Sequence, residues 1–192
     1  MPSHSETDRR ALLELARRAI EEAVSLMKPL GIIPRTGVFA ERHGVFVSLH
    51  ACGRLRGCIG VVEAAEPLGE AIARCAASAA LQDPRFSPVG SNELQALQIE
   101  ISLLSAPEPI LPENIEIGKH GLLISQGPRR GLLLPQVAVE HKLSREEFLE
   151  ETCRKAGLEA NAWREQATQV HGFSCEVFSE GSNAAEEPRA AI

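Results

Sequence analysis

The stretch that decides the fold reads Gly44-Val-Phe-Val-Ser-Leu-His50, then Ala51-Cys-Gly-Arg54, then Leu55-Arg-Gly-Cys-Ile-Gly-Val-Val62. In both outer segments apolar residues recur at every second position, which is the period of a half-buried β-strand. The short connection Cys52-Gly-Arg54 places a glycine where a tight turn needs a positive φ. The sequence therefore predicts an antiparallel hairpin with a three-residue loop.

The register of this hairpin follows from its two apolar faces. They coincide only if the connection adds an odd number of residues, because a one-residue slip turns every side chain to the other face. A three-residue loop with a glycine bulge supplies that parity. The predicted pairs are Val47 with Ile59, Ser48 with Cys58, Leu49 with Gly57, and His50 with Arg56.

Arg56 and Cys58 form the first candidate site. Residues two apart on a strand share a face, and a guanidinium beside a thiol favours the thiolate, the form that attacks electrophiles or binds metals. Ser48 and His50 would lie on this face around Gly60, whose missing side chain leaves room for another backbone or a ligand. The alternative is a buried cysteine that fills a small gap and an arginine solvated at a sheet edge.

Composition sets the broad class of the protein. The chain has 192 residues, 44% of them hydrophobic and 24% charged, which is typical of one soluble globular domain. Its five cysteines are odd in number and contain no CxxC pair, so reduced thiols are expected. No long apolar run and no basic, apolar leader occur, which predicts a cytoplasmic protein with no membrane contact. A net charge of -6 and sparse aromatic residues disfavour nucleic acid.

The remaining pattern indicates helices and strands without a βαβ rhythm. Helices are predicted over 8–28, from Pro67 to the stop at Asp83-Pro84, and from the capping box at Ser144 to Gly157; strands are predicted over 97–104, 122–125, 131–134 and 172–178. Cys75 and Cys153 fall on the inner faces of their helices and are predicted to be core residues. The fold class is α+β, mostly antiparallel sheet with flanking helices.

Four further residues are candidates for binding or catalysis, each with a simpler alternative. His120, between glycines, has the side chain of a neutral-pH acid or base, or is a surface histidine without a role. Glu100, if buried, needs a partner such as Arg56 or Arg85. Arg85 either holds an anion or forms a salt bridge at the helix stop, the second interpretation being favoured. Gln136, predicted to end a strand, either donates to an oxyanion or only satisfies backbone groups of a turn.

Sequence signatures of common cofactors are missing. The chain contains no P-loop, no GxGxxG before a helix, no HExxH, no GxSxG and no cysteine triplet for an iron–sulfur cluster. The sequence therefore predicts no cofactor and singles out no metal ligands.

Several of these motifs together resemble the AMMECR domain family, in order and spacing, over roughly residues 10 to 180. They are Leu55-Arg-Gly-Cys-Ile-Gly60, Asp83-Pro-Arg-Phe86, Ile99-Glu-Ile-Ser102, Gly118-Lys-His-Gly121, Leu134-Pro-Gln-Val-Ala138 and Lys155-Ala-Gly-Leu158. The six-residue run is the hallmark of the family. The resemblance implies one α+β domain over residues 1–180, made of a larger and a smaller subdomain, followed by a polar tail over 181–192 that is predicted to be disordered.

The resemblance implies no settled activity. Prokaryotic members are often encoded beside, or fused to, a Memo-like protein and a radical SAM protein, which suggests a pathway that modifies a protein or a small molecule. The leading hypothesis makes Cys58 a nucleophile or covalent carrier, Arg56 its activating or anion-binding cation, and His120 the proton shuttle. The alternatives are a non-catalytic adaptor or ligand-binding module that uses the Arg-Gly-Cys patch and, less favoured, an RNA-binding protein.

The leading hypothesis predicts that residues from distant parts of the sequence meet at one site. Arg56, Cys58 and His120 should border one concave pocket, with Glu100 or Arg85 within reach, because chemistry requires groups from distant segments to meet.

Overall fold

The computed structural model describes residues 3–181 as an α+β protein of two compact units, as the sequence predicts. The large unit is formed by the chain up to Leu103 and again from Glu176; the small unit is Leu104–Cys175. Apart from Gly181, the predicted tail lies outside the described residues. No helix within residues 3–181 combines the length and the apolar character that a membrane span requires.

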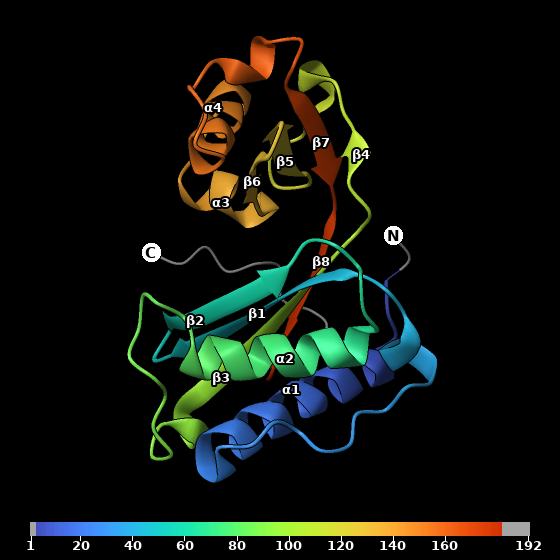
Figure 1. Ribbon diagram of the computed structural model, residues 1–192, viewed down its shortest axis with the longest axis vertical. Helices are drawn as coiled ribbons and strands as arrows, with labels where there is room; N and C mark the ends of the chain where they lie inside the picture. Colours follow the sequence, from blue (N-terminus) through green and yellow to red (C-terminus); the bar gives the residue numbers. More distant parts are fainter. Residues whose placement is uncertain (1–2, 182–192) are drawn as a thin grey trace. The chain divides into compact units, whose positions relative to one another are not determined.

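The large unit consists of a four-stranded sheet, in the order β2-β1-β3-β8, with two helices on one face (Figure 1). Its elements are α1 (Glu6–Leu26), η1 (Gly37–Ala40), β1 (Gly44–Ala51), β2 (Arg54–Val61), α2 (Leu68–Leu81), η2 (Leu94–Ala96), β3 (Leu97–Leu104) and β8 (Cys175–Ser179). Helix α2 packs on β1 and β2, and α1 packs on α2. Their apolar stripes enclose a core that includes Leu12, Ile20, Leu49, Ile72, Cys75 and Ile99. Burial of this apolar surface is the main stabilising contribution.

The small unit contains the second antiparallel sheet, in the order β4-β7-β5-β6. Its elements are β4 (Glu108–Pro109), η3 (Pro112–Asn114), β5 (Gly121–Gln126), β6 (Arg129–Leu133), α3 (Pro135–Glu140), α4 (Arg145–Lys155), η4 (Ala162–Arg164) and β7 (Gln169–Phe173). Helix α4 begins with the predicted capping box, in which Ser144 and Glu147 satisfy each other's backbone N–H groups. It packs on β5 and β6 over a core that includes Leu122, Ile124, Phe148, Leu149 and Cys153.

The hairpin of β1 and β2 confirms the predicted register beside Cys58 and corrects it nearer the turn. Ser48 lies opposite Cys58, as predicted, but His50 lies opposite Leu55 rather than Arg56. The turn has only two central residues, Cys52 and Gly53, both at positive φ (50° and 72°), as in the tight hairpin turns that match strand twist.

The extra residue that keeps the apolar faces aligned is Arg56 in the strand, rather than a third residue in the loop. It lies between Leu55 and Gly57, which face His50 and Leu49, so the ladder shifts by one at a β-bulge. Both arrangements satisfy the parity of the apolar faces. The predicted loop length was therefore wrong, although the predicted parity was right.

Two predicted elements differ from the structure. The segment 172–178 is not one strand, because Ser174 separates β7 from β8, which belong to different sheets. The Ser174 N–H donates to Ser105 Oγ, and the Ser105 N–H donates to Ser174 O, both at 3.0 Å. In addition, Gln136 does not end a strand but lies in α3, which begins at Pro135, a favoured first helical residue.

Candidate functional site

Cys58 is held at three atoms in the middle of β2. Its N–H donates to Asp83 Oδ2 at 2.8 Å, and its carbonyl accepts from Arg85 Nη2 at 3.3 Å. Ser48 Oγ donates to the half-buried sulfur at 3.3 Å from the facing position of β1. The hairpin register brings Ser48 to the thiol, whereas Asp83 and Arg85 come from the loop after α2. The thiol therefore has a fixed orientation before any ligand binds.

Asp83 organises this loop. Its carboxylate, 2% exposed, accepts from the Arg85 backbone N–H at 3.1 Å and from Arg85 Nε and Nη2 at 3.0 and 2.7 Å. The Arg85 guanidinium, against the opposing effect of burial, holds the pKa of Asp83 well below its usual range. The helix stop with a salt bridge, the favoured interpretation of this motif, is confirmed.

The Arg85 guanidinium also has a free edge. Its side chain is 56% exposed, and Nη1 has no hydrogen-bond partner among residues 3–181. A guanidinium oriented on one edge by a carboxylate and open on the other is a suitable donor to a planar anion.

Arg56 has a different partner from the one that its position in the sequence suggests. Its Nε and Nη2 donate to the carboxylate of Glu93 at 2.9 and 3.0 Å, and its other donors bind the carbonyls of Ser87 and Pro88. Hydrogen bonds from Arg56 lower the pKa of Glu93. Because a bulge re-aims the side chain that it carries, Arg56 ties the hairpin to the loop before η2.

The glycines of the hallmark are explained by packing. An added Cβ at Gly57 would lie 2.1 Å from the backbone oxygen of Ala79, so α2 rests directly on β2. At Gly60 it would lie 2.3 Å from the Phe46 ring. The space expected at Gly60 for a backbone or a ligand is therefore filled by Phe46.

The other predicted residues of the large unit contribute less definite contacts. His50 is half-buried, and its Nε2 is buried without a hydrogen-bond partner among the described residues. Glu100 is half-buried on β3 and takes part in a polar contact. Cys75 is buried in the core, as predicted, and burial raises the pKa of its thiol to about 11. Cys75 is therefore not a nucleophile at neutral pH.

Two predicted residues belong to the small unit. His120 precedes β5, and its Nδ1 accepts from the Glu116 N–H at 3.1 Å, which leaves Nε2 as the protonated nitrogen of the neutral ring. Gln136 has a buried Oε1 without a partner among residues 3–181. The structure thus brings together Ser48, Cys58 and Arg85, whereas the convergence of Cys58 with His120 stays a prediction.

Sequence reasoning missed two features of the large unit. One is Asp83 as the acceptor for the Cys58 N–H, for which a separation of 25 residues gave no signal. The other is a cluster of His4, Glu41 and His43, whose side chains are close enough to hold a metal ion. Its one sequence signal is Glu41-x-His43, because alternate residues of an extended segment share a side.

Asp83 makes stability depend on pH. Its folded pKa lies below the unfolded value of about 3.9, so its contribution is complete above that value and is lost as the pH falls towards the folded pKa. We expect Asp83→Asn to lower the free energy of unfolding by about 2 kcal/mol at neutral pH, because it weakens hydrogen bonds to a charged group. Urea unfolding in neutral and acid buffers measures this difference, which should shrink below about pH 4.

A control for this prediction is Glu113→Gln, which changes an exposed carboxylate in η3. Its unfolding free energy should follow that of the wild type at every pH. An Asp83→Asn deficit that stays constant from neutral to acid pH would contradict the assignment.

Comparisons with known proteins identify the family. The AMMECR1 family model matches residues 13–178. A protein of Methanosarcina acetivorans is 44% identical, the match covering 92% of this chain and 93% of the relative; one of Methanothermobacter thermautotrophicus is 43% identical, with 92% and 96% covered. The crystal structure of an uncharacterized protein from Pyrococcus horikoshii superposes with a TM-score of 0.86 at 40% identity, covering 92% of this chain and 93% of that one. The chain belongs to the AMMECR1 family.

Proposed function

We propose that Cys58 is the nucleophile of an enzyme that modifies a substrate bearing an electrophilic carbon and an anionic group, and that Arg85 holds the anion. The observation that carries this proposal is the three-point support of Cys58 by Asp83, Arg85 and Ser48. Two of these contacts bind the backbone of Cys58 and would hold any residue there, whereas the Ser48 hydroxyl contacts the sulfur itself. A cysteine that only filled a gap would not need this third contact.

The cation that serves the thiol is Arg85 rather than Arg56. Arg85 Nη2 donates to the Cys58 carbonyl at 3.3 Å, so this guanidinium binds the residue that carries the thiol. Arg56, in contrast, is bound to Glu93. The Ser48 hydroxyl donates a hydrogen bond to the sulfur from the facing strand.

The proposed step is a nucleophilic substitution at carbon. The sulfur forms a bond to the electrophilic carbon while the bond to the leaving group breaks, and the leaving group takes the proton that the thiol gave up. His120 is the proposed carrier of this proton. Memo-like and radical SAM proteins are the proposed partners in the same pathway.

A second candidate function is a non-catalytic adaptor that binds an anionic ligand or a partner at Arg85. The glycines favour it, because Gly57 and Gly60 are required by packing against α2 and Phe46 whatever the thiol does. In this case the hallmark would stabilise the fold, and the surface near the thiol would bind without reacting.

Thiol reactivity distinguishes the two functions. The full chain is treated with iodoacetamide at slightly acid pH, and the labelling rate of each cysteine is followed by mass spectrometry of its peptide. We expect Cys58 to react faster than a free-thiol reference, and Arg85→Gln to slow it about tenfold, because the guanidinium that binds the Cys58 carbonyl is lost. Buried Cys75 and Cys153 serve as internal references that stay unlabelled.

Arg56→Gln is the matched control, because it removes a guanidinium two residues from Cys58 that binds Glu93. Its Cys58 labelling rate should stay close to that of the wild type. If Cys58 reacts no faster than the reference thiol, the nucleophile is rejected and the adaptor remains. If Arg56→Gln slows labelling as much as Arg85→Gln does, the assignment of Arg85 is wrong.

A further inference from the structure

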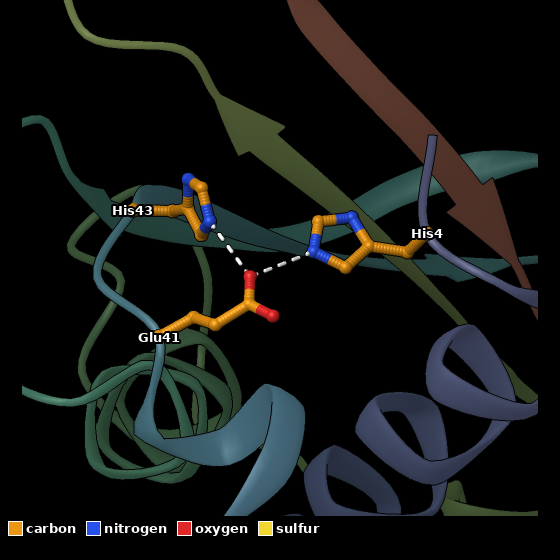
Figure 2. Close-up of side chains that lie close together, drawn as sticks. All are labelled: His4, Glu41 and His43. Carbon is orange, nitrogen blue, oxygen red and sulfur yellow. Dashed lines mark hydrogen bonds and ion pairs between the residues drawn. The ribbon is translucent and has the colours of Figure 1, made fainter. Parts of the chain in front are cut away.

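Two histidines and a glutamate meet at the surface of the large unit (Figure 2). His4 precedes α1, and Glu41 and His43 lie in the extended segment before β1. Glu41 Oε2 is 3.0 Å from His4 Nε2 and 3.0 Å from His43 Nε2. One oxygen thus lies between two imidazole nitrogens, and all three atoms lie within 4.8 Å of one another.

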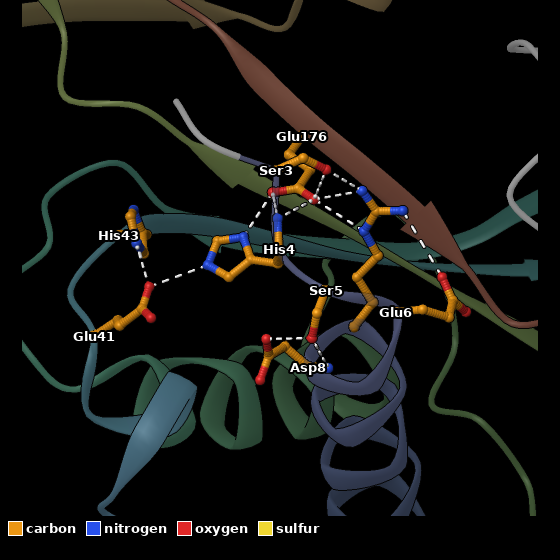
Figure 3. Close-up of polar contacts among 9 residues, drawn as sticks. Ser3, His4, Ser5, Glu6, Asp8, Glu41, His43 and Glu176 are labelled. Atoms are coloured by element: carbon orange, nitrogen blue, oxygen red, sulfur yellow. Dashed lines mark hydrogen bonds and ion pairs between the residues drawn. The ribbon is translucent and has the colours of Figure 1, made fainter.

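His4 is oriented from behind by a second carboxylate, Glu176 of β8 (Figure 3). Glu176 Oε2 lies 2.6 Å from His4 Nδ1, and Oε1 accepts from the His4 N–H at 3.0 Å and from Arg9 Nε at 2.9 Å. A carboxylate on Nδ1 directs Nε2 of the same ring towards Glu41.

This arrangement resembles a metal centre in which three side chains are ligands and a further carboxylate orients one of them. Histidines that bind metals donate their other ring N–H to a carboxylate or carbonyl, which fixes the tautomer and raises the basicity of the ligating nitrogen. We propose that His4 Nε2, Glu41 and His43 Nε2 bind a divalent transition-metal ion, with Zn²⁺ as the best match, and that Glu176 is the positioning residue of this site.

The donor set selects the class of metal. Two imidazole nitrogens and one carboxylate oxygen suit Zn²⁺ and its first-row neighbours, whereas Ca²⁺ and Mg²⁺ prefer oxygen ligands alone. Bonds of about 2.0–2.1 Å in a tetrahedron place neighbouring donors about 3.3 Å apart. The two contacts of 3.0 Å are already close to that spacing, and the two histidine nitrogens lie within 4.8 Å of each other.

Exposure of the ligands indicates where a fourth position lies. The side chains of His4 and His43 are 9% and 20% exposed, whereas Glu41 is 45% exposed. The histidines therefore form the inner wall, and the side of Glu41 opens to solvent. Three protein ligands and an open position leave room for water or a small ligand on the metal.

Metal binding replaces protons at this site. A ring nitrogen that donates a hydrogen bond to Glu41 must lose that proton to coordinate, so each coordinated Nε2 that carried a proton releases it to solvent. The metal then joins three segments, namely the segment before α1, the segment before β1 and, through Glu176, strand β8. Metal binding should consequently stabilise the folded chain.

The test uses the full chain, freed of metal with a chelator at mildly alkaline pH and titrated with Co²⁺ as a spectroscopic probe, then with Zn²⁺ in competition. We expect one equivalent of Co²⁺ to give visible bands of a nitrogen and oxygen site, without a sulfur-to-cobalt charge-transfer band. Zn²⁺ should displace Co²⁺ and raise the melting temperature.

Variants assign the ligands. Glu41→Gln and His43→Gln should each abolish Co²⁺ binding at concentrations that saturate the wild type, and Glu176→Gln should weaken it about 10–100-fold. His141→Gln, which removes an exposed histidine of the small unit, is the matched control and should bind as the wild type does. Circular dichroism of each metal-free variant verifies that it is folded.

Three outcomes would overturn the proposal. They are Co²⁺ affinity equal in the wild type and both ligand variants, a sulfur charge-transfer band in the bound state, or no binding by the wild type. Because the last two are read on the wild type alone, a ligand variant that fails to fold leaves the test intact.

Discussion

A Gly57→Ala variant is expected to lose about 3 kcal/mol or more of unfolding free energy. The added Cβ would lie 2.1 Å from Ala79 O and 3.1 Å from its carbonyl carbon. These are backbone atoms of α2, so no side chain can rotate away. Either α2 or β2 must shift, and the core between them is disrupted.

Urea unfolding followed by circular dichroism measures this loss. Gly31→Ala is the matched control, because a Cβ there meets no atom within 4 Å and the backbone φ is not in the left-handed region. Its unfolding free energy should change by no more than about 0.5 kcal/mol. Equal stability of the two variants would contradict the close contact between α2 and β2.

A Phe148→Ala variant is expected to lose about 3–5 kcal/mol of unfolding free energy, because a large side chain is removed from the core of the small unit. Phe148 is fully buried on the inner face of α4, and truncation removes an aromatic ring from the middle of the apolar core of this unit. The surrounding side chains can fill the cavity only in part.

The control for this variant is Leu111→Ala, which shortens a large apolar side chain that is 59% exposed. It should change the unfolding free energy by about 0.5 kcal/mol or less. Thermal unfolding of both proteins gives the comparison. A Phe148→Ala midpoint close to that of Leu111→Ala would show that the core of the small unit refills the space.

Local periodicity was sufficient to predict most elements, because each buries one face. Strand β3 has the predicted bounds, and Ser48 faces Cys58, since the two-residue period of a strand fixes which side chains share a side. The same period cannot decide where an odd residue is placed. A three-residue loop and a two-residue loop followed by a bulge at Arg56 give the same alternation of apolar and polar positions.

The alternation of apolar residues at 172–178 led to the wrong prediction of a single strand for a related reason. Alternation continues through Ser174, but the chain leaves one sheet and joins another there, and only the contacts with distant Ser105 show the break. A pattern along one segment contains no information about which strands it pairs with.

Long-range polar contacts account for what the sequence could not predict of the candidate site. Arg56 is two residues from Cys58, yet its charge is paired with Glu93, whereas Arg85 donates to the Cys58 carbonyl. His4 and Glu176 are separated by 172 residues. Separations of this kind have no periodic signature, so proximity in sequence indicated neither the contacts of Cys58 with Asp83 and Arg85 nor the cluster around His4.

The placement of the small unit inside the sequence of the large one has a consequence for the order of assembly during synthesis. Strand β8, the last partner of β3, is made only after Leu104–Cys175 has left the ribosome, so the domain that begins first is completed last. If the inserted segment folds first, the hydrogen bonds between Ser105 and Ser174 hold its two ends together. Folding of the inserted segment has then already closed the long loop between β3 and β8, at its cost in chain entropy. Strand β8 therefore emerges next to the strand that it must join.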